Sequence, residues 1–216
     1  MDFALARHNM VEGQIRTNRV TDSLVVEALE ELPREAFLSD VLKNMAYIDE
    51  DITVGTGRIM MEPMVLARLM QFAAIEESDV ALVVGGATGY EAAAIAKIAS
   101  AVIAVESDDG LSQLATETLS AQGCDTVSMV SGDLTKGDPD QGSYDVIFIN
   151  GSVGDLPQSL TDQLAEGGRL VYVKTSAGTG KAILATKTDG VVSEVELFDA
   201  NVPALPEFAA KPKFTF

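Results

Sequence analysis

A glycine-rich turn and one acid downstream of it are the residues whose types and spacing could do chemistry. The turn is Gly85-Gly-Ala-Thr-Gly89, directly after an apolar run, and Glu106 ends a second apolar run 21 residues after Gly85. Such a turn lets the backbone approach a ligand, and the first N–H groups of the next helix are free to bind it. An acid at the tip of the second strand can accept both hydroxyls of a ribose. The pattern predicts a nucleoside pocket.

The residues that the turn lacks narrow the kind of nucleotide. A dinucleotide fingerprint needs glycine at positions 85, 87 and 90, where this chain has Ala87 and Tyr90 at the last two. No Gly-Lys-Ser/Thr follows, so a Walker loop is excluded. A nucleoside without phosphates fits better, and S-adenosylmethionine is such a ligand. The alternative is that the glycines only tighten a strand-to-helix turn and Glu106 only ends a strand in water.

An alternation of apolar runs and helical stretches must position these residues. Runs that are apolar throughout are typical of strands buried on both faces, and helical stretches of about a dozen residues between them imply parallel pairing through right-handed crossovers. The sequence therefore predicts an α/β fold with a doubly wound, mostly parallel, Rossmann-like sheet. Strands are expected at 80–84, 102–105, 127–130, 146–149 and 170–173, and helices at 90–98, 111–121 and 157–164.

The flanks of this core have their own patterns. Residues 3–45 are expected to be mainly helical, with Asp22 as an N-cap and Pro33 as a stop. Residues 47–59 are expected to be irregular because of Gly55 and Gly57, and Pro63 opens another helix. Residues 182–216 alternate as antiparallel strands would. We expect one domain, with a helical N-terminal extension and substrate loop at 1–78 and the nucleoside-binding core at 79–216.

The composition limits the classes of partner. The chain has 33 Asp and Glu against 15 Lys and Arg, a formal net charge of −18. Such a surface repels nucleic acid and anionic lipid, and it suits cationic small molecules or basic peptides, or simply solubility. No apolar window approaches the roughly 18 residues of a membrane span, so a cytoplasmic protein is expected. Cys124 is the only cysteine and His8 the only histidine, and we expect packing for the first, a surface helix for the second, and no metal site.

Many stretches together carry a family resemblance. The chain resembles the protein-L-isoaspartate O-methyltransferases, which are class I S-adenosylmethionine-dependent enzymes. The stretches that match are 20–28, 32–37, Ala46-Tyr47, 55–57, 63–67, 84–90, Val105-Glu106, Gly132-Asp133, 144–147 and 164–170.

The resemblance implies a reaction and a set of site residues. A side-chain carboxylate of an isoaspartyl residue in a damaged protein attacks the methyl group of S-adenosylmethionine, giving a methyl ester and S-adenosylhomocysteine. That carboxylate is already anionic, so alignment can suffice and no catalytic residue is assigned. The resemblance places the cofactor at Gly85, Gly86, Ala87, Gly89, Tyr90, Glu106, Asp133 and Leu134, and the substrate loop at Arg58, Ile59, Met60, Met61 and Pro63. Asp133 could equally be an ordinary turn acid, and Asn150 with Gly151 could line the far side of the cofactor.

Two departures from the family pattern fall on the reactive side of this pocket. Family members carry Thr-x-Ser before the proline at position 63, where this chain has Ile59 and Met61. The loss of two hydroxyls is expected to weaken the orientation of a carboxylate; Arg58 could supply a replacement contact or could be merely exposed. The family also has an acid at position 83 and glycine at 87, where Val83 and Ala87 stand.

Three functions therefore compete. The first is a methyltransferase acting on isoaspartyl protein. The second is a catalytically eroded family member that binds an adenosine cofactor or serves as a scaffold, or a methyltransferase with another carboxylate acceptor. The third, an NAD-linked oxidoreductase, is disfavoured by Ala87 and Tyr90. The oligomeric state cannot be predicted.

Overall fold

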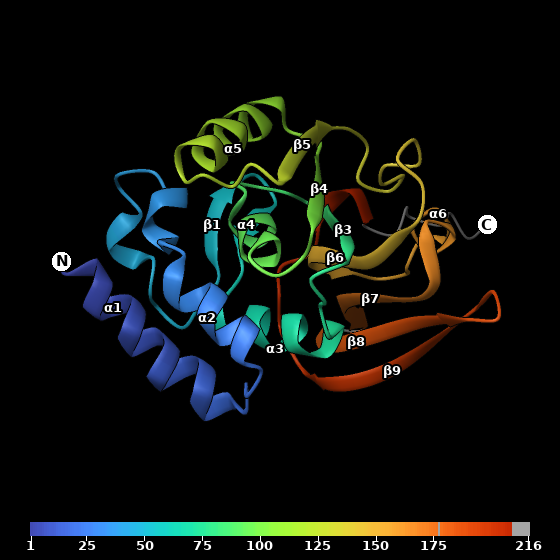
Figure 1. Ribbon diagram of the computed structural model, residues 1–216, viewed down its shortest axis with the longest axis horizontal. Coiled ribbons are helices and arrows are strands. Elements are labelled where there is room, and N and C mark those ends of the chain that lie inside the picture. Colours follow the sequence, from blue (N-terminus) through green and yellow to red (C-terminus); the bar gives the residue numbers. More distant parts are fainter. Residues whose placement is uncertain (177, 209–216) are drawn as a thin grey trace, which may run out of the picture.

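A seven-stranded sheet forms the centre of the computed structural model, which describes residues 1–176 and 178–208 (Figure 1). The strand order is β5-β4-β3-β6-β7-β8-β9. Strands β3 to β7 pair in parallel, and β8 and β9 add to the β7 edge in antiparallel fashion. The doubly wound, mostly parallel sheet with antiparallel C-terminal strands is confirmed. The strands are β3 (Val80–Val84), β4 (Ala101–Glu106), β5 (Val127–Ser131), β6 (Tyr144–Val153), β7 (Leu164–Ser176), β8 (Thr179–Thr188) and β9 (Val191–Asp199).

The alternation of side chains along β3 explains why its apolar run is continuous. Ala81 and Val83 face a cluster on one side of the sheet, while Leu82 and Val84 face a second cluster on the other. A strand buried on both faces needs apolar residues at every position. The first cluster also contains residues of α2, α3, α4 and α5, and the second contains residues of α6 and of the chain after β9.

The helices begin and end where local signals indicate. The Asp22 side chain accepts hydrogen bonds from the N–H groups of Leu24 and Val25, which caps α2. Pro63 stands at the start of α3, where its missing N–H costs nothing. The helices are α1 (Phe3–Met10), α2 (Ser23–Glu31), α3 (Pro63–Ala73), α4 (Tyr90–Ala96), α5 (Asp109–Ala121) and α6 (Gln158–Asp162), with short π or 3-10 turns at Val11–Ile15, Arg16–Asn18, Arg34–Phe37, Lys43–Met45 and Pro206–Phe208.

The expectation that residues 47–59 are irregular is wrong for most of its length. Strand β1 (Ile52–Gly55) pairs with β2 (Arg58–Met60) as an antiparallel hairpin. Gly57, with φ of 66°, lies in its tight turn. Gly55 ends β1, paired with Arg58, and Gly57 forms the turn of the hairpin, because glycine adopts positive φ without strain.

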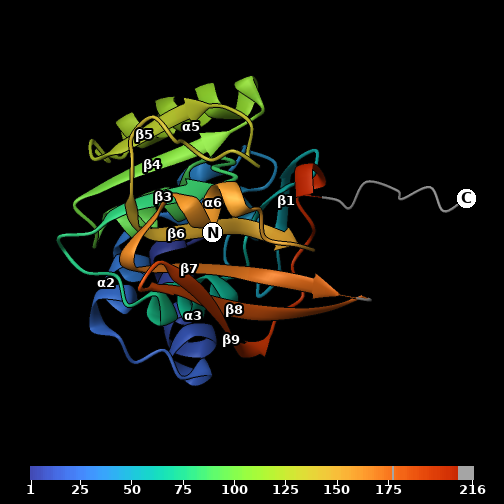
Figure 2. The same ribbon diagram turned by 90° about the vertical axis from the view of Figure 1, so that its right-hand side faces the viewer.

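The chain after β9 returns to the edge of the sheet at which β6 ends. The Ser152 N–H donates to the Pro203 carbonyl (2.9 Å), and the Leu205 N–H donates to the Ser152 carbonyl (3.0 Å). Figure 2 shows this segment, in red, running past the ends of β6 and β7 to lie beside β1. The strand-like alternation expected for 182–216 therefore holds only to Asp199, and residues 209–216 lie outside the described part of the chain.

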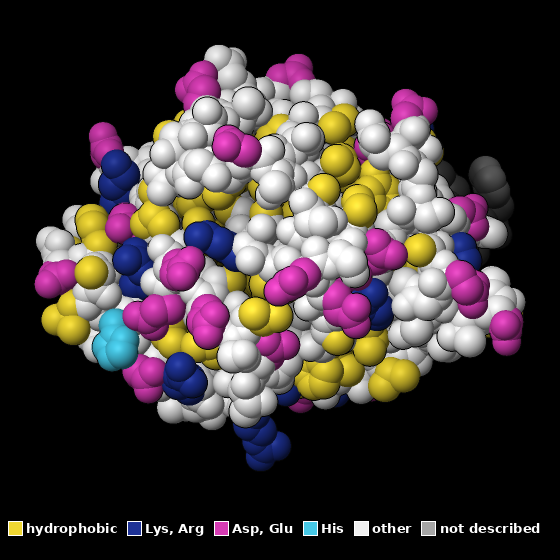
Figure 3. Space-filling model, viewed as in Figure 1, with side chains coloured by type: hydrophobic (Ala, Val, Ile, Leu, Met, Phe, Trp, Pro, Cys, Tyr) yellow, Lys and Arg dark blue, Asp and Glu magenta, His cyan; other side chains and the backbone are white. Residues whose placement is uncertain are grey.

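Acidic side chains are spread over the molecular face seen in Figure 3 and outnumber the basic ones there. None of the helices formed by residues 1–176 and 178–208 combines the length and the apolar character needed to cross a bilayer.

Candidate functional site

The glycine turn lies where the strand order reverses. β4 lies on one side of β3 and β6 on the other, so the chain leaves β3 at the switch point of the sheet. Ligands of open α/β sheets bind in the crevice beyond the carboxyl ends of strands at such a point. Asn150, near the end of β6, donates its amide N–H to the carbonyls of Gly85 (3.1 Å) and Ile59 (3.3 Å). The turn, β6 and the β1–β2 hairpin therefore meet at this crevice.

The turn has a conformation that favours glycine at three positions. Gly85, Ala87 and Gly89 all have positive φ, of 83°, 46° and 92°. At Ala87 this left-handed backbone costs about 1 to 2 kcal/mol relative to an ordinary one. The Ala87 N–H donates to Glu106 Oε2 (2.9 Å), which holds the turn against the tip of β4.

Glu106 is fully buried, and both of its carboxylate oxygens are hydrogen-bonded. Oε1 accepts from the backbone N–H groups of Ser107 (2.8 Å) and Asp108 (3.0 Å). The Nε of Arg58 lies 2.9 Å from both Oε1 and Oε2. The acid expected to bind ribose hydroxyls is thus engaged by an arginine and three backbone amides of its own chain.

Arg58 is 3% exposed, so the alternative of an exposed arginine is wrong. Besides Glu106, it donates through Nη2 to Ser107 Oγ (2.8 Å) and to Glu207 Oε1 (2.6 Å), and through Nη1 to Glu207 Oε2 (3.3 Å). Burial lowers the pKa of Arg58, but its hydrogen bonds to Glu106 and Glu207 outweigh burial and raise it. Arg58 does contact carboxylates, and both belong to this chain.

Glu207 closes this network from the C-terminal side. Burial pushes its pKa up, but the hydrogen bonds from Arg58 and Ser107 prevail and hold the pKa below its ordinary value. Two residues earlier, Leu205 is 1% exposed and packs on the glycines. A Cβ built on Gly85 would lie 3.4 Å from Leu205, and one built on Gly151 would lie 2.7 Å from it.

The predicted substrate loop is buried in the core. Arg58, Ile59, Met60, Met61 and Pro63 are all nearly inaccessible to solvent. The Met61 peptide is clamped from two sides: its N–H donates to Glu91 Oε1 (2.9 Å), and its carbonyl accepts from Arg34 Nη2 (2.5 Å).

Two acids beside this loop have strongly shifted pKa values. Complete burial raises the pKa of Glu91 to about 7, against the lowering effects of the Met61 N–H and of Arg34. Partial burial and the neighbouring charges of Asp51, Asp49 and Glu50 raise the pKa of Glu62 to about 7. Both carboxyls therefore titrate near neutral pH.

The remaining predicted residues lie in several different surroundings. The Tyr90 ring packs edge-on against Phe37 and under the Arg34 guanidinium. Asp133 is exposed and accepts from the N–H and hydroxyl of Thr135, as a turn acid does, while Leu134 is buried in the second cluster. Gly86 packs against Met129, and a Cβ added to Gly86 would lie 2.9 Å from Met129 Cε.

His8 lies in α1, as expected, with Nδ1 3.2 Å from Glu30 Oε1. Cys124 is partly buried against the first cluster.

Ser107, Leu205 and Glu207 are the site residues that sequence reasoning missed. Glu207 lies 149 residues from Arg58 along the chain, and no local pattern links them. Glu91, which bonds the Met61 peptide, was also missed. Its sequence does carry a signal for a buried acid, because Glu91 is the one charged residue in the otherwise apolar helix Tyr90-Glu-Ala-Ala-Ala-Ile-Ala96.

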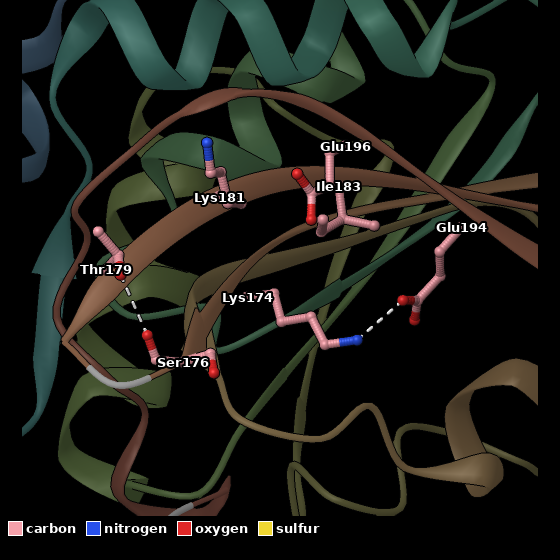
Figure 4. Close-up of a pocket in the computed structure, with 7 residues that line it drawn as sticks. All are labelled: Lys174, Ser176, Thr179, Lys181, Ile183, Glu194 and Glu196. Atoms are coloured by element: carbon pink, nitrogen blue, oxygen red, sulfur yellow. Dashed lines mark hydrogen bonds and ion pairs between the residues drawn. The ribbon is translucent and has the colours of Figure 1, made fainter.

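A cavity of about 630 Å³ lies elsewhere in the described part of the chain (Figure 4). It is lined by side chains of β7, β8 and β9, including Lys174 and Glu194, which form an ion pair of 2.9 Å. None of the predicted site residues lines it. The crevice at Glu106, by contrast, is occupied by Arg58 and by Leu205, which packs on Gly85.

Comparison with known proteins places the chain among methyltransferases. Residues 6–198 match the model of the family described as protein-L-isoaspartate(D-aspartate) O-methyltransferase. A protein-L-isoaspartate O-methyltransferase of Methanoculleus marisnigri is 32% identical over 191 residues, covering 88% of this chain and 87% of the relative. One from Koribacter versatilis is 34% identical over 199 residues, covering 92% and 90%.

Solved structures agree in fold. A protein-L-isoaspartate O-methyltransferase structure superposes with a TM-score of 0.82 at 24% identity; it covers 92% of this chain, which spans 65% of that longer one. A putative enzyme of this kind from Plasmodium falciparum, in complex with S-adenosyl-L-homocysteine, gives a TM-score of 0.79 at 21% identity, covering 93% of this chain and 98% of that one. By the family match and the identities to curated relatives, the chain belongs to the protein-L-isoaspartate(D-aspartate) O-methyltransferase family.

Proposed function

We propose that this protein transfers a methyl group from S-adenosylmethionine to the side-chain carboxylate of isoaspartyl residues in proteins. The observation that carries the proposal is the pairing of the Gly85–Gly89 turn with Glu106 at the switch point of the sheet, in a chain that matches the family over residues 6–198. The cofactor would lie along this turn with its ribose toward Glu106. Its partners would be damaged proteins or peptides.

The residues around Glu106, as they are arranged here, do not fit that cofactor. A ribose needs a carboxylate whose oxygens can accept its hydroxyls, and both oxygens of Glu106 already accept from Arg58. Leu205 covers Gly85 and Gly151, which a ligand would have to approach. We therefore assign no reaction step to individual residues.

The bond between Arg58 and Glu106 favours a second candidate function, that of an eroded family member which acts as a scaffold. In that case the Arg58–Glu106 pair is a permanent replacement for the ligand. The two candidates differ in a property that can be measured directly, which is binding of the cofactor or its product.

A titration followed by an assay tests the proposal. Calorimetry with S-adenosylhomocysteine up to millimolar concentration is expected to show saturable binding. Methyl transfer from S-adenosylmethionine is then measured on an isoaspartyl peptide, with the aspartyl peptide of the same sequence as the matched control. We expect methyl ester on the isoaspartyl peptide alone. Binding without transfer to either peptide indicates another acceptor, and the absence of binding supports the scaffold.

The substrate loop provides a finer test. Ile59→Thr restores one of the two missing hydroxyls in a β-branched side chain that is one heavy atom shorter, and we expect it to raise isoaspartyl methylation several-fold. The control is Ile52→Thr, which makes the same change at a buried position on the neighbouring strand β1. Equal turnover in both variants would contradict the assignment of residues 58–63 to the substrate site.

A further inference from the structure

We infer that the segment comprising residues 202–208, here called the C-terminal segment, closes the cofactor site together with Arg58, so that S-adenosyl ligands bind only after this segment is displaced. The inference rests on the proposed function, because it concerns the same crevice. It adds a contact within the chain that competes with the ligand and so determines cofactor affinity.

The C-terminal segment is docked by its backbone and by apolar packing. Its two backbone hydrogen bonds to Ser152 extend the carboxyl end of β6, and Ala204 forms a parallel bridge with the same residue. Leu205 and Phe208 are buried in the second core cluster. A side chain of this size contributes about 1.5 to 3 kcal/mol when fully buried. The segment is therefore held at the crevice in a defined place.

Pro206 extends this contact to the β1–β2 hairpin. Its ring packs on Gly57 so closely that a Cβ added to this glycine would lie 2.3 Å from Pro206 Cγ. The hairpin turn and the C-terminal segment thus lie in direct contact. Movement of one affects the position of the other, and the next residue, Glu207, bonds the arginine at the start of β2.

Three charged side chains form a continuous ionic network, from Glu207 through Arg58 to Glu106. Arg58 joins a carboxylate on the C-terminal segment to the carboxylate at the tip of β4. The Glu207 side chain is 26% exposed, whereas those of Arg58 and Glu106 are 3% and 0% exposed. Water can therefore reach Glu207 first, and release of Glu207 leaves Arg58 Nη1 bonded only to the Gly57 carbonyl and Nη2 only to Ser107 Oγ among the described residues.

A single carboxylate cannot serve Arg58 and a ribose together. The Arg58 Nε donates to both Glu106 oxygens, whose other bonds come from three backbone amides. The three amides are fixed in the glycine turn and at the end of β4, so they cannot leave Glu106. Ribose hydroxyls must therefore take the place of Arg58. Ligand binding and the closed arrangement are therefore mutually exclusive.

The test compares affinities for S-adenosylhomocysteine in the full-length chain. Glu207→Gln removes the outer charge at nearly constant size, and Leu205→Ala removes the side chain that covers Gly85 and Gly151. Glu27→Gln, at an exposed position on α2, is the matched control. We expect each of the first two variants to bind at least tenfold more tightly than the wild-type chain, and the control to bind as the wild type does.

A second measurement uses the unaltered protein. Hydrogen exchange of peptides that cover residues 202–208 reports the Leu205 N–H, which donates to Ser152. We expect protection in the free protein and loss of that protection when S-adenosylhomocysteine binds. This readout stands even if a variant fails to fold.

The outcomes separate this inference from the function on which it rests. Equal affinities in all four chains, or a Leu205 amide that stays protected in the ligand complex, would overturn the closing role and leave the methyltransferase proposal intact. A further outcome is that none of the four chains binds S-adenosylhomocysteine, although hydrogen exchange shows residues 202–208 released in the variants. That outcome would overturn both the closing role and the proposed function. Tighter binding by both variants with loss of protection supports both.

Discussion

Two buried arginines, one at the start of β2 and one bonded to the chain just after β2, differ in how their charge is used. Arg58 bonds two carboxylates, Glu106 and Glu207. Among the described residues, the fully buried Arg34 bonds only carbonyls, those of Ala46 (2.6 Å) and Met61 (2.5 Å), and its guanidinium lies 4.8 Å from the Tyr90 ring centroid. An arginine bound to charged partners on separate segments can be released when one partner leaves. An arginine bound to backbone carbonyls is a fixed brace.

The acids near the two arginines differ correspondingly. Glu106 has a bonded guanidinium, whereas Glu91, on the far side of the Met61 peptide from Arg34, has one oxygen without a partner among the described residues. A buried carboxyl without a bonded cation is stabilised in its neutral form. The comparison therefore predicts a large structural penalty at the first arginine and a pH-dependent one beside the second.

The largest effect is expected at Arg58. Arg58→Met leaves Glu106 buried with only its backbone N–H partners, and loss of one partner of a buried ion pair costs about 3 to 5 kcal/mol of unfolding free energy. Urea unfolding measures it. Adding Glu106→Gln to this variant is expected to recover part of the loss, since no buried charge is then left. A loss below about 1 kcal/mol would show that the pair contributes little, and would remove the contrast with Arg34.

A pH-dependent effect of similar size is expected at Glu91. Its pKa of about 7 in the folded chain exceeds the ordinary value of 4.5. Between these values the folded chain keeps a proton that the unfolded chain has released, so stability falls as pH rises from about 4.5 to 7. A shift of this size corresponds to about 3 kcal/mol.

Glu91→Gln should therefore be more stable than the wild type by up to this amount at pH 8, while the two chains converge near pH 4. Urea unfolding across this pH range measures the difference, and Glu27→Gln on the exposed side of α2 is the control. A difference that does not change with pH would contradict the neutral form.

A smaller loss is expected from Arg34→Lys. An ammonium can reach one of the two carbonyls but not both, and a buried carbonyl without a partner costs about 1 to 3 kcal/mol. The measurement is again urea unfolding, repeated in 1 M NaCl. Because the lost contact is to a neutral carbonyl, the loss should not depend on salt. A loss that disappears in salt would mean that Arg34 acts through its charge, as Arg58 does.

The smallest effect is expected at an exposed arginine. Arg16 lies 2.8 Å from Glu12, and both side chains are 52% exposed. Pairs of this kind contribute about 0.3 to 0.5 kcal/mol, which salt screens. Arg16→Ala should lower the unfolding free energy by no more than that. A loss above about 1 kcal/mol would show that burial is not what separates the arginines of this chain.

The parts of the fold that local patterns determine could be predicted. The apolar run 80–84 coincides with β3, and Glu106 stands at the end of β4 as expected, because strands buried on both faces leave a continuous apolar signal. Asp22 and Pro63 mark helix starts for equally local reasons. The family, the cofactor class and the α/β fold followed from the same stretches.

The contacts that fill the site could not be predicted in this way. Arg58 and Glu106 are 48 residues apart, and Arg58 and Glu207 are 149 apart. Nothing in the residues around 58 distinguishes a buried arginine from an exposed one. The β1–β2 hairpin was missed because strands of four and three residues are too short to show a period. The site residues proposed for the cofactor therefore remain predictions that ligand binding must test.

The end of β9 lies close to the crevice, and this proximity turns the C-terminal segment into a tethered competitor. Only three residues separate Asp199 from Pro203, whose carbonyl bonds Ser152. A short tether gives an effective local concentration in the millimolar range or above. When a fraction f of the molecules is open, the apparent dissociation constant of a ligand is its intrinsic value divided by f. Substitutions at positions 203 to 208, far from the glycine turn along the sequence, can thus tune cofactor affinity by changing the fraction of open molecules rather than the contacts that the glycine turn and Glu106 make with the cofactor.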